Sequence, residues 1–64
     1  MKHYLFDSKQ KKYLARLENS KEGYFLTDEK EKAYRFLEDE IDLAWHTVYK
    51  CAWLGIGQFF VYGE

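Results

Sequence analysis

The stretch of residues 27–55 constrains the fold most, because its two ends have the signals that begin and end a helix. Thr27 and Asp28 are both suited to cap the first free N–H groups. Gly55 is suited to the left-handed conformation that ends a helix. Between these limits apolar residues recur at steps of three and four, the period of a helical face. They are Ala33, Leu37, Ile41, Ala44, Val48, Cys51 and Ala52. The sequence therefore predicts one long helix or two helices in tandem.

The predicted helix is longer than one small sheet can cover. An unbroken helix of ~27 residues is ~40 Å long, whereas a strand of five or six residues covers ~17–20 Å. Either the helix breaks within residues 36–38, or a second subunit covers the excess. We therefore expect the chain to self-associate.

An aromatic row, formed by Trp45, Tyr49 and Trp53, runs beside the apolar stripe at helical spacing. Packing against a sheet and contact with another protein both account for such a row. Trp and Tyr on a rigid helix are typical anchors of protein interfaces. The polar residues that would form the rim of that interface are Asp39, Asp42 and His46.

Four short segments have the composition of strands, namely residues 2–6, 11–17, 24–27 and the tail 58–64. Turn-forming residues separate the first three of them. In the second segment Tyr13, Ala15 and Leu17 alternate with Lys12, Leu14 and Arg16, which predicts one half-buried face. We predict an α+β fold of order β-β-β-α-β in a single domain, 1–64. Its small, mostly antiparallel sheet packs on one long helix in the C-terminal half.

The small size of the chain also favours association with another subunit. A chain of 64 residues buries only ~60% of its unfolded surface, near the lower limit for folding alone. The aromatic content of 20% partly compensates, and oligomerisation is another common remedy.

The cellular compartment follows from two further features. The single Cys51 excludes an intrachain disulfide and suits a reducing environment, and its place in the apolar stripe predicts a packed thiol. The N-terminus lacks a long apolar run, and no segment is apolar enough to span a bilayer. We therefore expect a cytoplasmic protein with no membrane partner.

Few residues are arranged for catalysis. Cys51 and His46 are five residues apart on the predicted helix, so they would point to different faces and could not form a nucleophile–base pair. Asp42 and His46 have the spacing of two metal ligands, but two ligands alone make a weak site. No glycine-rich phosphate loop precedes a helix. We predict no enzyme activity, no metal and no cofactor.

Nucleic-acid binding is the alternative function, because basic residues gather around the first predicted hairpin. Residues 1–21 have a net charge of +4 and residues 22–64 a net charge of −5. A basic hairpin with interleaved aromatic residues suits a phosphate backbone and stacked bases. The residues of this alternative site are Lys9, Lys11, Lys12, Tyr13 and Arg16. The acidic residues of the second half are also compatible with a mimic of nucleic acid.

The segment YFLTDEKEKAYRF resembles a pattern found in small proteins of bacteriophages and other mobile elements. The pattern is a short strand, a Thr/Asp cap, and then Ala and Phe three residues apart before an acidic helix. Here those positions are Thr27, Asp28, Ala33 and Phe36. The resemblance implies a compact, non-catalytic inhibitor that binds host or defence machinery, such as a nucleic-acid-guided nuclease. Our leading hypothesis is therefore a non-enzymatic protein that binds a macromolecular target and forms homo-oligomers.

Overall fold

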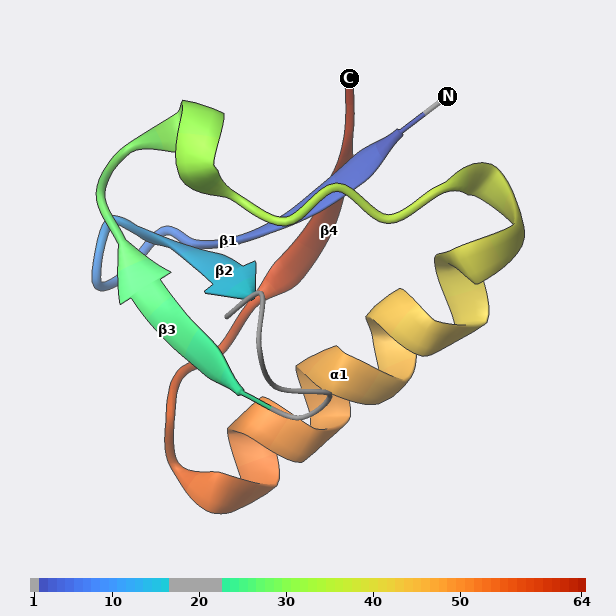
Figure 1. Ribbon diagram of the computed structural model, residues 1–64. Coiled ribbons are helices and arrows are strands. Elements are labelled where there is room, and N and C mark those ends of the chain that lie inside the picture. The colour runs from blue at the N-terminus through green and yellow to red at the C-terminus, as the bar shows by residue number, and fades with distance from the viewer. Residues whose placement is uncertain (1, 17–22) are drawn as a thin grey trace.

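The computed structural model describes residues 2–16 and 23–64. Four strands form one antiparallel sheet of order β3-β2-β1-β4, with a helix on one face (Figure 1). The strands are β1 (His3–Asp7), β2 (Lys12–Arg16), β3 (Tyr24–Thr27) and β4 (Phe60–Gly63). The helical elements are the 3-10 turns η1 (Lys30–Lys32) and η2 (Glu38–Glu40) and the helix α1 (Ile41–Leu54). The predicted α+β class and the order β-β-β-α-β are confirmed, while the predicted loop 18–22 and Leu17 lie outside the described residues.

Of the two arrangements predicted for residues 27–55, one continuous helix is wrong, and the chain instead breaks before α1. The Thr27 hydroxyl accepts the Glu29 N–H at 3.2 Å, as a capping residue would, but only the single turn η1 follows. Residues 33–37 are then extended, so the chain breaks close to the predicted position. The helix proper has 14 residues and ends where expected, at Gly55 with φ of 75°. The Ile56 N–H then donates to the Cys51 carbonyl at 2.9 Å, which closes the last turn.

The extended segment 33–36 is inserted between two strands that separate. β1 and β2 pair only at the turn end, where Phe6 lies opposite Tyr13. Further along, the Tyr34 N–H donates to the Leu14 carbonyl of β2 at 3.0 Å. On the other side, His3 and Phe36 exchange two backbone hydrogen bonds of 2.9 and 2.7 Å. Tertiary hydrogen bonds and burial of Phe36 thus override the local helical pattern.

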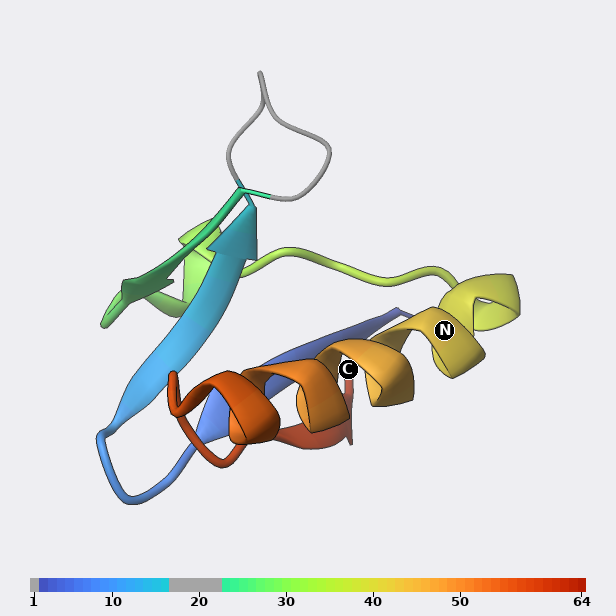
Figure 2. The same cartoon turned by 90° about the horizontal axis from the view of Figure 1, so that it is seen from below.

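The core lies between the sheet and α1. Leu5 of β1 and Leu14 of β2 point towards the helix and are buried with Phe36 and Phe59. Figure 2 shows α1 running across the sheet, where it contacts β1 and β4. Its buried residues are Ala44, Thr47, Val48 and Cys51. Leu37 and Ala52 of the predicted stripe are exposed instead, because the break moves Leu37 off the helix and Ala52 lies on its flank.

Both sheet faces are covered at the centre of β2, which differs from the predicted single buried face. Leu14 is 1% exposed on the helix side, and Ala15 is also 1% exposed on the opposite side. The turn η1 contacts β2, and Ala33 just after it is buried. The segment of η1 and Ala33 therefore covers the second face of β2 around Ala15. Strand alternation alone predicts that one face of such a strand is exposed to solvent.

A buried carboxylate joins the β1–β2 turn to the connection between α1 and β4. Asp7 is 2% exposed and accepts hydrogen bonds from the Lys9 and Gln10 N–H groups and from the Gln10 amide. The Gln58 N–H, 51 residues later, donates to Oδ2 of the same carboxylate at 3.0 Å. Gly57 lies so close that a Cβ atom there would be 2.7 Å from Oδ2. A side chain at position 57 would displace the Gln10 amide and the Asp7 carboxylate, so glycine fits the point where the two chain segments meet.

Candidate protein-binding interface

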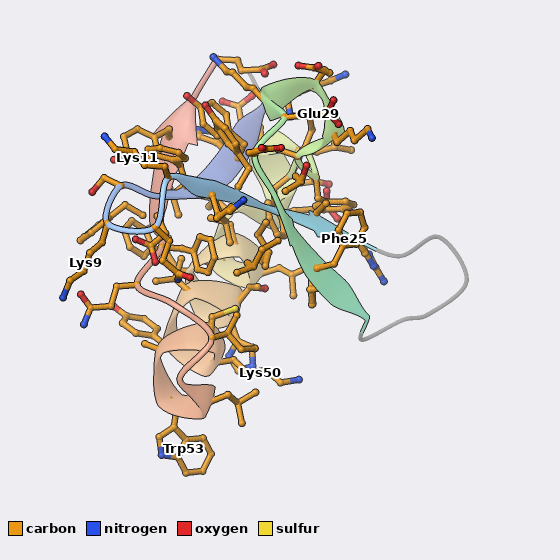
Figure 3. All side chains as sticks on the ribbon, turned by 90° about the vertical axis from the view of Figure 1, so that its left-hand side faces the viewer. Lys9, Lys11, Phe25, Glu29, Lys50 and Trp53 are labelled. Carbon is orange, nitrogen blue, oxygen red and sulfur yellow. The ribbon has the colours of Figure 1, made fainter. Side chains whose placement is uncertain are left out.

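The aromatic row lies on the solvent-facing side of α1. Trp45 is 40% exposed, Tyr49 69% and Trp53 89%. The ring centroids of Trp45 and Tyr49 are 6.4 Å apart, so these two rings support each other. Trp53 projects away from the body of the protein at the end of the helix (Figure 3). Packing of the row in the core, one of the two explanations that the sequence allows, is therefore wrong.

A shallow groove lies beside the most exposed part of the row. It has a volume of about 500 Å³. Its lining residues are His46, Tyr49, Lys50, Trp53 and Leu54. All of them belong to α1, so a rigid helix fixes their relative positions. The surface presents two large aromatic rings, the residue types that are enriched at protein interfaces, beside an imidazole and an ammonium group.

The predicted polar rim is only partly assembled around this groove. His46 lines the groove directly, and Asp42, one turn earlier on the same side of α1, is exposed. Asp39 is also exposed, but it lies in η2, before the helix begins. His46 and Asp42 thus border the row, whereas Asp39 is at the far end of the helix from Trp53.

The two flanks of α1 face different edges of the sheet. On one flank Thr47, Lys50 and Leu54 share a small depression with Tyr24 of β3. On the other flank Ala52 lies beside Gln58, which leads into β4. Because successive residues are rotated by about 100° around a helix, Trp45 and Tyr49 share the flank of Ala52. The first two rings of the row are therefore on the β4 side of the molecule.

The basic residues of the predicted nucleic-acid site do not form one surface. Lys9 and Lys11 are exposed in the β1–β2 turn (Figure 3). In β2, Lys12 and Arg16 point to one face of the sheet and Tyr13 points to the other, because side chains alternate along a strand. Arg16 lies over the ring of Tyr34, 5.5 Å from its centroid, on the core side. Strand alternation separates the stacking residue Tyr13 from two of the four cations.

An aromatic cluster on the sheet face opposite α1 was not predicted from the sequence. Tyr13 packs on Phe6 with a centroid distance of 4.6 Å, and Tyr4 stacks on Tyr62 at 5.7 Å. Lys30 and Arg35 both lie over the Tyr4 ring. Part of this cluster could have been found in the sequence, since alternation places Tyr4 and Phe6 on one face of β1. Tyr62 could not have been added to it without knowing that β1 pairs with β4, at the opposite end of the chain.

The residues considered for catalysis are far from an active-site arrangement. Cys51 is 3% exposed, and burial raises the pKa of its thiol although the nearby Lys50 acts in the opposite direction. The thiol is packed in the core, as its place in the stripe predicts. His46 lies on the outer side of the helix. In residues 2–16 and 23–64, no three His, Cys, Asp or Glu side chains are grouped to hold a metal ion.

Comparison with protein-family models, with curated proteins and with solved structures finds no match for this chain. Within the described part of the chain, no helix is long and apolar enough to cross a membrane. The exposed face of α1 and the sheet are therefore the features of this chain that bear on its function.

Proposed function

We propose that this protein is a non-enzymatic binding protein that occupies the surface of another protein through the aromatic row of α1. The exposure of Trp53, 89% on a rigid helix, is the observation that carries the proposal. Covering a large, solvent-exposed ring with a partner gives a large favourable free energy of burial. Trp and Tyr also dominate the binding energy of many interfaces. The groove beside Trp53 supplies a concave surface for one partner side chain.

The resemblance to small phage proteins gives this proposal a concrete form. A compact chain that covers a functional surface of a larger machine inhibits it without chemistry of its own. We infer that the target class is host or defence machinery, such as a nucleic-acid-guided nuclease. The action would take place in the cytoplasm, where the free thiol of Cys51 stays reduced.

The variant Trp53→Ala tests the proposal. Because the ring has almost no intramolecular packing to lose, the free energy of unfolding should change by less than about 0.5 kcal/mol. Loss of this anchor should weaken target binding by about 2 kcal/mol or more, roughly 30-fold. Binding is measured by calorimetry against the purified target, and inhibition by the cleavage rate of a guided nuclease with and without the protein.

Leu43→Ala is the matched control. Leu43 is an apolar residue of α1 that is 43% exposed on the flank opposite Trp45, outside the groove. This variant should bind the target as the wild type does. Equal affinity of the wild type and Trp53→Ala would show that the row is not the binding surface. A wild type that leaves nuclease cleavage unchanged would rule out the inhibitor form for that enzyme.

Nucleic-acid binding remains a second candidate because of the aromatic cluster on the sheet face opposite α1. Four rings from three adjacent strands lie together there, and partly exposed rings on a sheet face are suited to stack on bases. Lys30 and Arg35 supply positive charge beside them, and Lys11 lies in the turn at one end. This surface differs from the predicted hairpin site, because it includes Tyr13 but excludes Arg16.

Titration of a single-stranded oligonucleotide at two salt concentrations tests this candidate. If the cluster is the site, binding should weaken as salt rises, and Lys11→Glu should reduce the affinity and flatten the salt dependence. Lys50→Glu makes the same change in net charge on α1 and should leave binding unaltered. No binding at low salt, or an equal loss in both variants, would eliminate a specific site on the sheet.

A further inference from the structure

β4 is an edge strand, and within residues 2–16 and 23–64 no other strand pairs with its outer side. The hydrogen-bonding groups on that side can be assigned from the pairing with β1. Tyr4 lies opposite Tyr62 and Leu5 opposite Val61. In the same register, the Glu64 N–H donates to the Lys2 carbonyl at 3.0 Å. Because bonded and non-bonded pairs alternate in an antiparallel ladder, Tyr62 also bonds to β1, while Val61 does not.

The backbone N–H and C=O groups of Val61 and Gly63 therefore point away from β1, to the open edge. The orientation of β1 supports this assignment, because His3, opposite Gly63, directs its backbone groups to Phe36 on the other side. The residues of β4 are Phe, Val, Tyr and Gly, without the Lys, Pro or bulge that commonly protects an exposed edge. Phe60 is 56% exposed and Tyr62 39%.

From these observations we propose that β4 pairs with β4 of a second copy of this chain, antiparallel, around a two-fold axis at Tyr62. In this register Val61 of each copy forms backbone hydrogen bonds with Gly63 of the other copy. The outward N–H and C=O groups of both residues are then all paired. The two Tyr62 side chains face each other as a non-bonded pair, the arrangement in which opposite side chains are closest. The result is a continuous sheet of eight strands.

The position of α1 fits the same two-fold axis. The helix contacts both β1 and β4, so we place it over these two strands. With strands ~4.8 Å apart, the two copies of α1 would lie about 10 Å from each other on the same face of the joined sheet. Packed helices are separated by 8–10 Å. The flank of α1 that would face the second copy carries Trp45 and Tyr49.

Four exposed rings supply part of the apolar surface that such a dimer would bury. Trp45 and Tyr49 of α1, together with Phe60 and Tyr62 of β4, expose on the order of 400 Å² of ring surface, and the paired β4 backbones add to this area. A stable interface buries about 800 Å² on each partner. The other edge strand, β3, lacks this support because the flank of α1 nearest to it carries Lys50 and Leu54. The dimer leaves Trp53, at the outermost end of the row, available for the proposed target.

Disulfide trapping tests the pairing and its register. In a Cys51→Ala background, Tyr62→Cys places two thiols opposite each other across the axis, at a separation that a disulfide can bridge. Under mild oxidation this variant should form a covalent dimer. Phe60→Cys is the control at another exposed position of β4, where the partner residue would be Glu64, and it should form no disulfide-linked dimer. Absence of the Tyr62→Cys product, or equal cross-linking of both variants, would overturn the proposal.

Charge complementation provides a second test that does not depend on oxidation. Light scattering should give a dimer for the wild type and a monomer for each of Tyr62→Lys and Tyr62→Glu, because like charges would meet at the axis. An equimolar mixture of the two variants should form a heterodimer. Circular dichroism verifies that both variants fold. The pairing would be contradicted if the wild type stayed monomeric at 100 times the concentration needed for light scattering. Folded Tyr62 variants that remain homodimers would contradict it as well.

Discussion

Phe36→Ala is expected to lower the free energy of unfolding by about 3–5 kcal/mol, as for other large-to-small changes in a core. Phe36 is 0% exposed, packs edge-on against Tyr34 with a centroid distance of 4.7 Å, and belongs to the segment that joins β1 to β2. A chain of 64 residues has about 3–10 kcal/mol of total stability, so this loss would unfold a large fraction of the protein. Urea denaturation followed by Trp fluorescence measures it.

Phe25→Ala is the control for this prediction. Phe25 is the same residue type in the edge strand β3, but it is 40% exposed. Its replacement should cost about 1 kcal/mol, because much of the ring already contacts water. If the two variants were destabilised equally, residues 33–37 would not be part of the folded core. The insertion of this segment between β1 and β2 would then be wrong.

Asp7→Asn is expected to lower the free energy of unfolding by about 1–3 kcal/mol at neutral pH. The Asp7 Oδ2 atom accepts hydrogen bonds from both the Gln10 amide and the Gln58 N–H. An asparagine has only one carbonyl oxygen, so its amide NH₂ must face donors that then lack an acceptor. An unsatisfied donor of this kind costs roughly 1–3 kcal/mol.

The same carboxylate predicts how stability depends on pH. Burial acts to raise the pKa of Asp7, but the hydrogen bonds from Gln10, Gln58 and Lys9 outweigh it and lower the pKa in the folded state. A lowered pKa means that the ionised group stabilises the fold above the pKa of unfolded aspartate, about 4, and that this contribution is lost as the pH falls through the folded value.

The stability difference between the wild type and Asp7→Asn should therefore shrink as the pH falls from 7 to 3. Urea midpoints at the two pH values measure it. Ser8→Ala, a change at an exposed turn residue next to Asp7, serves as the control and should show the same difference at both values. The stability difference between the wild type and Asp7→Asn could instead stay constant from pH 7 to pH 3. That result would show that hydrogen bonds to the ionised carboxylate do not stabilise this junction.

Local signals predicted the elements that depend on local chemistry. Tyr24–Thr27 forms a strand as its composition predicts, and Gly55 ends α1 in the left-handed conformation. The tail strand was expected within residues 58–64 and is formed by Phe60–Gly63. In each case neighbouring residues determine the backbone conformation.

The features that were missed depend on contacts between distant residues. The helical period of Ala33 and Leu37 continues that of α1, but hydrogen bonds to His3 and Leu14 hold residues 33–36 extended. A turn between the first two strand segments was predicted, whereas the hydrogen bond between Asp7 in that turn and Gln58 was not, because no local pattern connects positions 51 residues apart. For the candidate site, spacing predicted that Trp45, Tyr49 and Trp53 form a row, but only the position of the sheet shows that the row is exposed.

The place of β1 between β2 and β4 has a consequence for the order of folding. A hairpin of β1 and β2 can form early, but it pairs at one end only, and its other end needs Phe36 from the middle of the chain and Gly63 from its far end. Contacts across such long loops lose much chain entropy before they gain stability. We therefore expect the pairing of β1 to be completed late in folding, after the residues that follow α1 have reached the sheet.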